Sequence, residues 1–359
     1  SGAASDDGDG GTDTLSGIEN IVGSNQNDTL FGSAANNIIS GGAGDDTMVG
    51  RGGNDSFIGG FGNDLVDYTD AASGVTASLT AGVASDDGDG GQDSFTTVEN
   101  LTGSNFDDSL TGDGVANLLT GQGGDDILQG RGGTDVLDGG TGNDTADYSN
   151  AAGSVIADLL AGSASNDGDG ASDSFVSIEN LTGSGQADIL RGNNSANILN
   201  GGAGDDTSVG RGGADTLDGG SGNDTADYSG ASLGIDVNLT DGQAANDGEN
   251  NVDTLLNIEN VTGSAQNDVI IGDANNNILN GGGGDDLLSG RGGDDNIIGG
   301  TGNDTVDYSN AAAGVTASLT SGAASDDGDG GTDTLSGIEN ITGSANADVL
   351  TGDNNINIL

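Results

Sequence analysis

The stretch GGAGDDTMVGRGGNDSFIGGFGNDLVDY, from Gly41 to Tyr68, contains one short pattern three times in succession. Each copy of nine residues opens with glycine, carries aspartate at its sixth position and places a large apolar residue at its eighth, as in Met48, Phe57 and Val66. Glycine adopts the φ > 0 conformations of tight turns, and successive side chains of a strand point to opposite faces. The stretch therefore predicts a coil of turns and very short strands, each strand turning one apolar side chain inward.

This nine-residue pattern, which we call a nine, lies inside a longer repeat. The motif GRGG begins at Gly50, Gly130, Gly210 and Gly290, so one period has 80 residues. Five nines fill 45 residues of each period, and the other 35 form a segment that we call the insert. The blocks of nines are 23–67, 103–147, 183–227, 263–307 and a partial block 343–359; the inserts are a partial one at 1–22, then 68–102, 148–182, 228–262 and 308–342. Such a repeat predicts a solenoid, in which each unit stacks on its neighbours.

The composition narrows the class of protein. Among 359 residues, 73 are glycine and none is histidine, cysteine, proline or tryptophan; 59 acidic residues face five basic ones, a formal net charge of −54. High charge and low hydrophobicity alone favour disorder, but a disordered acidic chain has no reason to keep the nines in phase. Nucleic acid and anionic membranes are poor partners because their phosphates would be repelled. No apolar run is long enough to insert into a membrane.

Several nines, among them GGAGDDTMV, GGFGNDLVD and GGGGDDLLS, fit the pattern GGxGxDxUx, and the array resembles the RTX (repeats-in-toxin) family of calcium-binding nonapeptide proteins. The inserts are more loosely similar to segments between nonapeptide blocks in large secreted RTX proteins. The resemblance implies an all-β fold: a parallel β-roll, or β-solenoid, of tandem 80-residue units. It also implies Ca²⁺ as the cofactor, type I secretion, and a place at the cell surface or in the extracellular space.

The stacking of such a roll creates an electrostatic problem. If two nines make one turn, residues 18 apart lie one strand spacing apart, about 4.8 Å. Asp28 then lies over Asp46, Asp46 over Asp64, and Asn37 over Asp55. Five arginines cannot balance these carboxylates, whereas divalent cations can. Calcium is the best fit because it takes roughly 6–8 hard oxygen ligands, while zinc and copper prefer the histidine and cysteine that this chain lacks.

The sequence therefore predicts calcium bound between stacked pairs, about three ions per 80-residue unit, with the pairs that contain asparagine binding more weakly. The predicted ligands are Asp28, Asp46, Asp55, Asp64, Asp108, Asp126, Asp135, Asp144, Asp188, Asp206, Asp215, Asp224, Asp268, Asp286, Asp295, Asp304, Asn37, Asn117, Asn197 and Asn277. The insert stretch SDDGDGGQD at 85–93 is either a further calcium loop or a polar turn. The additional candidates there and in the last insert are Asp86, Asp87, Asp89, Asp93, Asp326, Asp327, Asp329 and Asp333.

Three other residue types recur once per period. Arg51 and its counterparts either form a stripe that contacts polysaccharide or an acidic chain, or make local salt bridges, which is the more common case for surface charges. Tyr68 and its counterparts are expected to close each block and pack on the insert. Glu99 of the motif VEN either accepts backbone N–H groups or joins a calcium site.

No residue is predicted to be catalytic. Histidine and cysteine are absent, and every carboxylate pair recurs with the repeat, whereas an active site is usually unique. The predicted function is a calcium-stabilised extracellular rod or filament segment of an adhesin, biofilm-matrix or surface-layer protein. One alternative is a carbohydrate- or protein-binding repeat module, which arginines and tyrosines on one exposed face would favour, whereas buried tyrosines would favour the rod. The other is a non-catalytic calcium-binding module of a secreted enzyme. The expected partners are calcium ions, copies of the same chain and surface polysaccharide. We also expect each period to fill four whole turns, roughly 19 Å.

Overall fold

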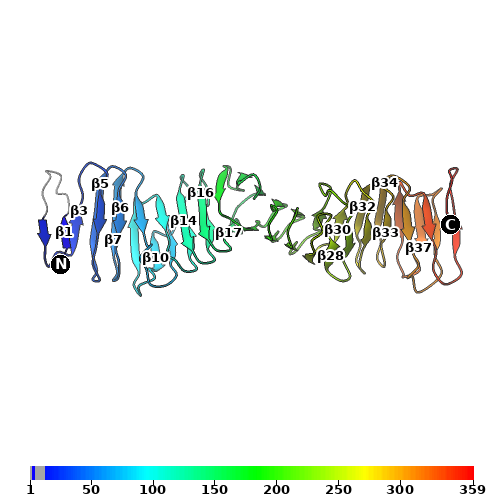
Figure 1. The fold of residues 1–359 in the computed structure, drawn as a ribbon, viewed down its shortest axis with the longest axis horizontal. Helices are drawn as coiled ribbons and strands as arrows, with labels where there is room; N and C mark the ends of the chain where they lie inside the picture. Colours follow the sequence, from blue (N-terminus) through cyan, green and yellow to red (C-terminus); the bar gives the residue numbers. More distant parts are fainter. Residues whose placement is uncertain (1, 5–12) are drawn as a thin grey trace. The chain divides into compact units, whose positions relative to one another are not determined.

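The computed structural model describes residues 2–4 and 13–359, with side chains from Thr14 onward, so the predicted partial insert 1–22 lies partly outside the described residues. In these ranges the chain forms strands and turns (Figure 1), and no helix occurs that could cross a membrane. It divides into two compact units, Ser1–Asn150 with Gly162–Ile178, and Ala151–Ala161 with Glu179–Leu359. Each unit is described by itself.

In the first unit, β1 (Gly2–Ala4) and β2 (Asp13–Leu15) form an antiparallel pair, and the other strands form two sheets. The first sheet contains, in spatial order, β3 (Asn20–Val22), β5 (Ile38–Ala43), β7 (Ser56–Phe61), β11 (Asp93–Thr96), β10 (Val83–Asp86), β9 (Thr76–Ser78), β13 (Ser109–Thr111), β15 (Ile127–Gln129) and β17 (Thr145–Asp147). The second contains β4 (Thr29–Phe31), β6 (Thr47–Val49), β8 (Leu65–Asp67), β12 (Asn100–Thr102), β14 (Leu118–Gly123), β16 (Val136–Thr141), β20 (Asp173–Val176) and β19 (Ser163–Asn166).

The second unit has the same design. Its first sheet contains β21 (Asn180–Thr182), β23 (Ile198–Asn200), β25 (Thr216–Asp218), β29 (Asp253–Leu256), β28 (Gln243–Asn246), β27 (Asp236–Asn238), β31 (Val269–Ile271), β33 (Leu287–Ser289), β35 (Thr305–Asp307) and β39 (Asn340–Thr342). Its second sheet contains β18 (Ile156–Asp158), β22 (Ile189–Arg191), β24 (Thr207–Val209), β26 (Thr225–Asp227), β30 (Asn260–Thr262), β32 (Ile278–Gly283), β34 (Asn296–Thr301), β38 (Asp333–Ser336), β37 (Ala323–Asp326), β36 (Thr316–Ser318) and β40 (Val349–Thr351).

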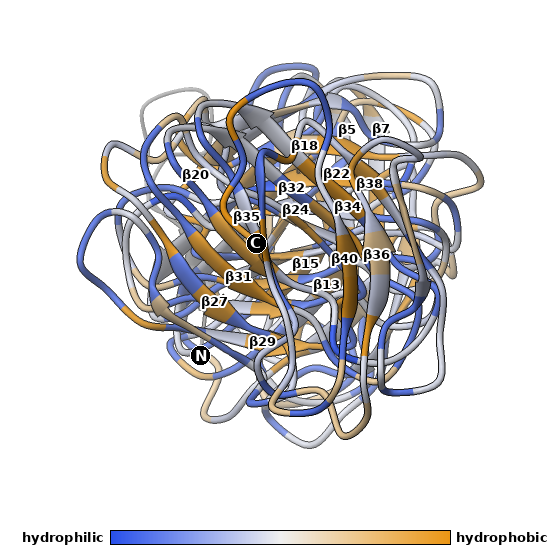
Figure 2. Ribbon diagram, turned by 90° about the vertical axis from the view of Figure 1, so that its right-hand side faces the viewer, coloured by the Kyte–Doolittle hydropathy of each residue, from blue (hydrophilic) through white to orange (hydrophobic). Residues whose placement is uncertain are grey.

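Successive nines alternate between the two sheets of a unit, so residues 18 apart pair in parallel. Leu110 of β13, for example, pairs with Leu128 of β15. Both leucines occupy position eight and are fully buried. Figure 2 shows the same segregation, with hydrophobic residues on strands such as β31 and β40 and hydrophilic residues in the loops. The fold is the all-β parallel β-roll that the sequence predicts, with a core supplied by one side chain from each short strand.

The inserts interrupt the parallel order. In insert 68–102, β9, β10 and β11 form an antiparallel meander, while β11 pairs in parallel with β7 of the preceding block and β9 with β13 of the next. The following strand, β12, lies in the other sheet between β8 and β14. An insert thus adds three strands to one sheet and one strand to the other.

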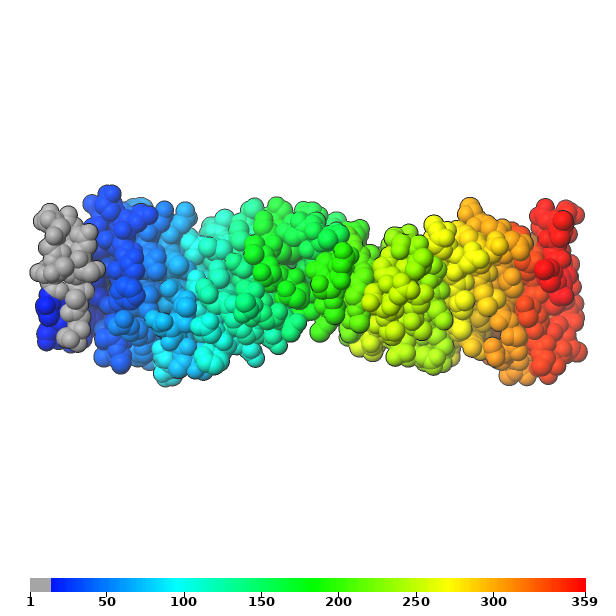
Figure 3. All heavy atoms as spheres, in the orientation of Figure 1, coloured from blue at the N-terminus to red at the C-terminus, as the bar shows by residue number. Residues whose placement is uncertain are grey.

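The expectation of four whole turns per period is wrong. In the second unit, β21 and β39 are 160 residues apart and are separated by nine strand spacings in one sheet, whereas β30, midway in sequence, lies in the other sheet. The reason is that the chain crosses from one sheet to the other an odd number of times in each 80-residue period, so the next period begins in the opposite sheet. The repeat of the roll is therefore 160 residues, or about 43 Å at strand spacing. The space-filling view shows the coils of each unit following in chain order (Figure 3).

The thin core leads to a first prediction. Leu128 is fully buried between Leu110 and Ala146, whereas its neighbour Ile127 is 44% exposed. We expect Leu128→Ala to lower the free energy of unfolding in millimolar calcium by about 2–5 kcal/mol, because it removes buried methyl groups and leaves a cavity. Ile127→Ala should change it by less than about 1 kcal/mol. Urea unfolding followed by circular dichroism measures both, and equal losses would contradict this description of the core.

Candidate metal centre

The position-six side chains form ladders along the edges of the roll. Oδ1 of Asp46 accepts the backbone N–H of Asp28 at 2.8 Å, and Oδ1 of Asp64 accepts that of Asp46 at 2.9 Å. On the other edge, Oδ1 of Asp55 accepts the N–H of Asn37 at 2.7 Å. The same bond joins Asp126 to Asp108, Asp135 to Asn117, Asp144 to Asp126, Asp206 to Asp188, Asp215 to Asn197, Asp224 to Asp206, Asp286 to Asp268, Asp295 to Asn277 and Asp304 to Asp286. The predicted stacking of position-six residues that lie 18 residues apart in the sequence is confirmed.

In the first two nines of each block, the position-six side chain also bonds to its own turn. Oδ2 of Asp188 accepts the N–H of Ser184, and its Oδ1 accepts the Ser184 hydroxyl at 2.9 Å. The Oδ1 of Asn197 accepts the N–H of Asn193 at 2.7 Å. We call these closed turns; the others are those of Asp28, Asn37, Asp108, Asn117, Asp268 and Asn277. In a closed turn, backbone N–H groups already satisfy the oxygens that the sequence assigns to calcium.

The third, fourth and fifth nines carry the glycine-rich turns GGxG or GRGG, and we call their turns open. In eleven of the twelve open turns of the full blocks, the second carboxylate oxygen is buried and accepts no hydrogen bond. These oxygens are the Oδ2 atoms of Asp46, Asp55, Asp64, Asp126, Asp135, Asp206, Asp215, Asp224, Asp286, Asp295 and Asp304. A buried anionic oxygen without a partner is strongly unfavourable, so this arrangement calls for a cation.

Backbone carbonyl oxygens of the next coil lie close to these unpartnered carboxylate oxygens. A Cβ on Gly201 would lie 2.3 Å from Oδ2 of Asp206 and 2.7 Å from the carbonyl oxygen of Gly219. A Cβ on Gly121 would lie 1.9 Å from Oδ2 of Asp126 and, likewise, close to a carbonyl oxygen of the next coil. Only glycine leaves this space free, and a carboxylate with a carbonyl oxygen is the ligand chemistry of Ca²⁺. Within the described residues no three His, Cys, Asp or Glu side chains converge on one point, so most ligands of an ion would come from the backbone.

Burial has a direct electrostatic consequence in the open turns. It raises the pKa of Asp126 and of Asp135 to about 7, although backbone N–H donors lower it in part. The pKa of Asp206 rises to about 6 for the same reason, with the charges of Asp188 and Asp224 adding to the effect. The ion-free roll therefore disfavours the charged form of these side chains, and a divalent cation would favour it.

The insert contains a nine that the sequence analysis missed. Residues 88–96, GDGGQDSFT, place Asp93 at position six and Phe95 at position eight, and Phe95 pairs with Phe57. Oδ1 of Asp93 accepts the N–H of Asp55 at 2.7 Å, as in the regular ladders. The spacing of glycine, aspartate and phenylalanine was a usable signal, but this nine follows Asp55 at a distance of 38 residues, not 18. Of the other insert candidates, Asp87 and Asp327 are buried, whereas Asp86, Asp89, Asp326 and Asp329 are exposed.

Tyr68 packs against the insert, as predicted. It is 4% exposed, its hydroxyl donates to Oδ2 of Asp93 at 2.9 Å, and its ring meets Phe57 edge to face at 6.5 Å between centroids. Its counterparts Tyr148, Tyr228 and Tyr308 are equally buried and donate to Asp173, Asp253 and Asp333. Burial of all four rings excludes a role in stacking on an external ligand.

The glutamate of the VEN motif accepts a backbone N–H group, which is the first of the two roles predicted for it. Oε2 of Glu99 accepts the N–H of Asp64 at 2.9 Å, and Glu259 and Glu339 bind Asp224 and Asp304 in the same way. Each glutamate therefore continues a position-six ladder where the chain returns from an insert. Its longer side chain suits the shorter loop that precedes it.

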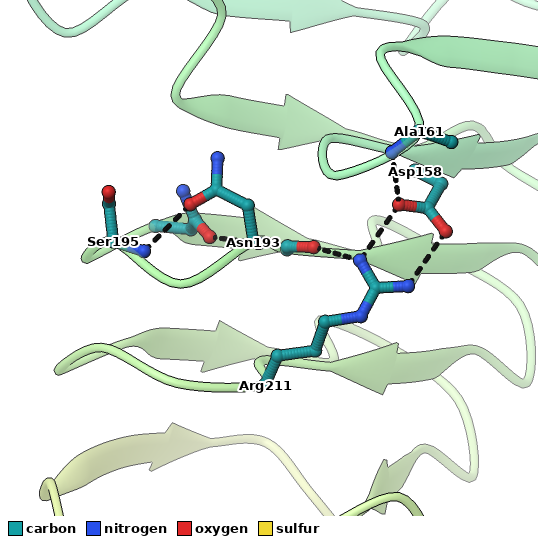
Figure 4. A network of polar contacts seen from close by, with 7 residues as sticks. Asp158, Ala161, Asn193, Ser195 and Arg211 are labelled. Carbon is teal, nitrogen blue, oxygen red and sulfur yellow. Dashed lines mark hydrogen bonds and ion pairs between the residues drawn. The ribbon is translucent and has the colours of Figure 1, made fainter. Parts of the chain in front are cut away.

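Arg51 and Arg211 bind backbone carbonyls of the preceding coil. Arg211 forms a salt bridge with Asp158 at 2.8 Å and also donates to the carbonyl oxygen of Gly192 (Figure 4). This interaction lowers the pKa of Asp158. Arg51 donates to the carbonyl of Gly32 at 3.2 Å, and its guanidinium lies 5.5 Å from the centre of the Phe31 ring. The local salt bridge is thus confirmed for Arg211, and partly exposed pairs of this kind contribute up to about 1 kcal/mol.

Comparison with known families agrees with this geometry. The family model of the RTX calcium-binding nonapeptide repeat matches residues 15–48, 31–66, 111–146, 177–208, 209–226, 257–288 and 271–306. Together these segments cover more than half of the chain, and the chain belongs to this family. It is a calcium-binding repeat module, of a type that is generally non-catalytic. No curated protein sequence matches the chain significantly.

The difference between open and closed turns leads to a second prediction. Asp206→Asn, in an open turn, should raise the calcium concentration at half-folding about tenfold, because it removes a charged ligand; that corresponds to about 1.4 kcal/mol. Asp188→Asn, in the closed turn one coil earlier, should shift the calcium midpoint less while it lowers thermal stability at saturating calcium, because it loses the bond from Ser184. Calcium titrations and melting curves of both variants measure this. A larger midpoint shift for Asp188→Asn would contradict the distinction.

Proposed function

We propose that this chain is a calcium-stiffened structural segment of a secreted extracellular protein, which spaces or assembles other parts of that protein. The observation that carries the proposal is the recurrence of unpartnered buried carboxylate oxygens in every full block, next to a core only one side chain deep. A core of this size is weak by itself, so binding of ions supplies much of the folding free energy. Calcium would ligate the open-turn aspartates, about three ions per 80-residue unit.

The proposed extracellular location follows from the calcium dependence of folding. At the low calcium concentration of a cytosol, the carboxylates repel and the chain stays unfolded, a state suited to export. At the millimolar calcium of an extracellular medium, ion binding drives folding. An adhesin, a biofilm matrix or a surface layer would each use such a segment, with neighbouring copies of the chain or surface polysaccharide as partners.

A binding module is the second candidate because unit 1 exposes aromatic rings. Phe61 is 84% exposed, and Phe31 and Phe106 are about half exposed. Exposed aromatic side chains are typical of surfaces that bind sugars or proteins. These three do not recur with the period, however: residues 141, 221 and 301, which correspond to Phe61, are Thr, Ser and Thr. A repeated ligand site along the roll therefore has little support.

Single-molecule stretching tests the structural role. In millimolar calcium we expect the chain to resist force until discrete unfolding events occur, because each ion joins two coils. In chelator it should extend smoothly, like an unstructured polymer. Equal resistance in both conditions would overturn the proposal. Binding to a glycan array in calcium, lost on Phe61→Ala, would favour the second candidate.

A further inference from the structure

The loop at the centre of each insert holds a second kind of buried carboxylate, one outside every nine. Asp87 is 0% exposed, and its Oδ1 accepts the N–H groups of Asp89 at 2.8 Å and Gly91 at 2.7 Å. Its Oδ2 is buried and accepts no hydrogen bond. Asp167 and Asp327 repeat this arrangement in the second and fourth complete inserts. The N–H groups thus bind one oxygen and orient the other into the interior.

The free oxygen of Asp87 faces an open turn. A Cβ on Gly91 would lie 2.5 Å from Oδ2 of Asp87 and 2.0 Å from the carbonyl oxygen of Gly53, so both oxygens border the same small space. Gly53 belongs to the turn of Asp55, whose own Oδ2 is buried without a partner. The fourth insert repeats this with Gly331, Gly293 and Asp327. In the second insert Ala171 replaces Gly91, and its Cβ takes up this space.

Electrostatics joins these groups into one cluster. Burial, with a smaller contribution from the charges of Asp93 and Asp87, raises the pKa of Asp55 to about 7. The nearest arginine in sequence, Arg51, donates to the carbonyl of Gly32 in the preceding coil. Within the described residues the cluster has negative charge and hard oxygen atoms, and no ion pair joins it to a basic side chain.

In the third complete insert the buried aspartate has a partner without an ion, although Oε2 of Glu249 in the same loop is buried and accepts no hydrogen bond. There Asn251 replaces Gly91, and its Nδ2 donates to Oδ2 of Asp247 at 3.1 Å. Oδ1 of Asp247 keeps its backbone donors, Glu249 at 2.7 Å and Asn251 at 2.9 Å. Glu249, in place of Asp89, keeps the outer bond, with Oε1 accepting the N–H of Ser232 at 3.0 Å. One side-chain amide thus provides the partner that the other three loops lack.

We propose that the loops of Asp87 and Asp327 each bind a calcium ion against the open turns of Asp55 and Asp295, and that the loop of Asp247 binds none. The ion would join the Asp87 carboxylate to the Gly53 carbonyl and the Asp55 carboxylate. It would hold the insert loop to the block before it. This inference rests on the calcium binding of the open turns proposed above, because the ion shares the Asp55 carboxylate.

Ion stoichiometry in the full chain tests the proposal. Wild type and the double variant Asp87→Asn, Asp327→Asn are dialysed to equilibrium against millimolar calcium, and bound calcium is measured per chain. Asparagine keeps the Oδ1 acceptor of the loop and removes the charge. We expect the variant to bind two ions fewer, one for each loop in which a free oxygen faces a glycine-lined space. The control is Asp86→Asn with Asp326→Asn, which changes exposed carboxylates of the same loops and should leave the count unchanged.

A gain-of-site variant keeps the test decisive if the double variant fails to fold. Asn251→Gly removes the amide that satisfies Asp247, so the third insert should bind one additional ion. An unchanged calcium count in a folded double variant would overturn the proposal. So would an unchanged count in Asn251→Gly. Either result leaves the calcium dependence of the nines untouched, because wild type is measured alongside.

Discussion

In calcium-free buffer at neutral pH, we expect the chain to lose its β-sheet signal in far-UV circular dichroism and to regain it cooperatively as calcium is added. The reason is the number of buried carboxylates that face one another with no basic partner, for example Asp126 between Asp108 and Asp144. Each site filled to about a hundred times its dissociation constant adds roughly 2.7 kcal/mol to the stability of the fold. Several such sites exceed the whole stability of a typical domain, about 5–15 kcal/mol.

Two controls separate binding from general screening of charge. Sodium chloride at equal ionic strength screens exposed charges but does not supply ligand geometry, so it should not restore the signal. Magnesium should restore little, because it demands octahedral geometry and releases its waters reluctantly. A chain that stays folded in chelator would show that the apolar core alone holds the roll, and would contradict calcium as an obligatory part of the fold.

The stability of the ion-free chain should have an unusual pH dependence. Burial raises the pKa of Asp55, Asp126, Asp135, Asp215 and Asp295 from 3.8 to about 7. A carboxyl whose folded-state pKa is raised binds protons more tightly in the folded state, so its contribution is fully present below its unfolded pKa and is lost as the pH rises through the folded value. Without calcium, β-sheet content should therefore increase as the pH falls from about 8 to about 5.

With calcium the sign should reverse, because protons compete with the ion for the same oxygens. Melting temperatures measured across this pH range in metal-free and calcium buffers should converge at the acid end. Replacing Asp55, Asp126 and Asp135 by asparagine should flatten the metal-free curve. The control, Asp45→Asn with Asp125→Asn, changes exposed ladder residues and should preserve the slope. A metal-free chain that gains stability as the pH rises would refute this account of the buried carboxylates.

The sequence alone determined the roll and its ladders. The position-eight residues predicted the core because a period of nine leaves one inward side chain per strand, and Leu110, Leu119 and Leu128 are all fully buried. Position-six residues of alternate nines lie 18 residues apart, and this spacing predicted their stacking because two nines make one turn. The hydrogen bond from the N–H of Asp28 to Oδ1 of Asp46 confirms the stacking. Both inferences depend on local periodicity, which a sequence displays directly.

Only the tertiary structure decided which carboxylate oxygens remain free and how the periods join. Asp188 and Asp206 look alike in sequence, but a serine in the turn satisfies the first and the glycine turn of the second does not. The nine around Asp93 stacks on Asp55 through a meander that runs backwards, at a spacing of 38 residues that the 18-residue spacing within the blocks does not predict. The alternation of the inserts between sheets depends on how many times the chain crosses the core. These features arise from contacts between coils. Their spacing in the sequence differs from the regular 18 residues, so the repeat pattern of the nines does not encode them.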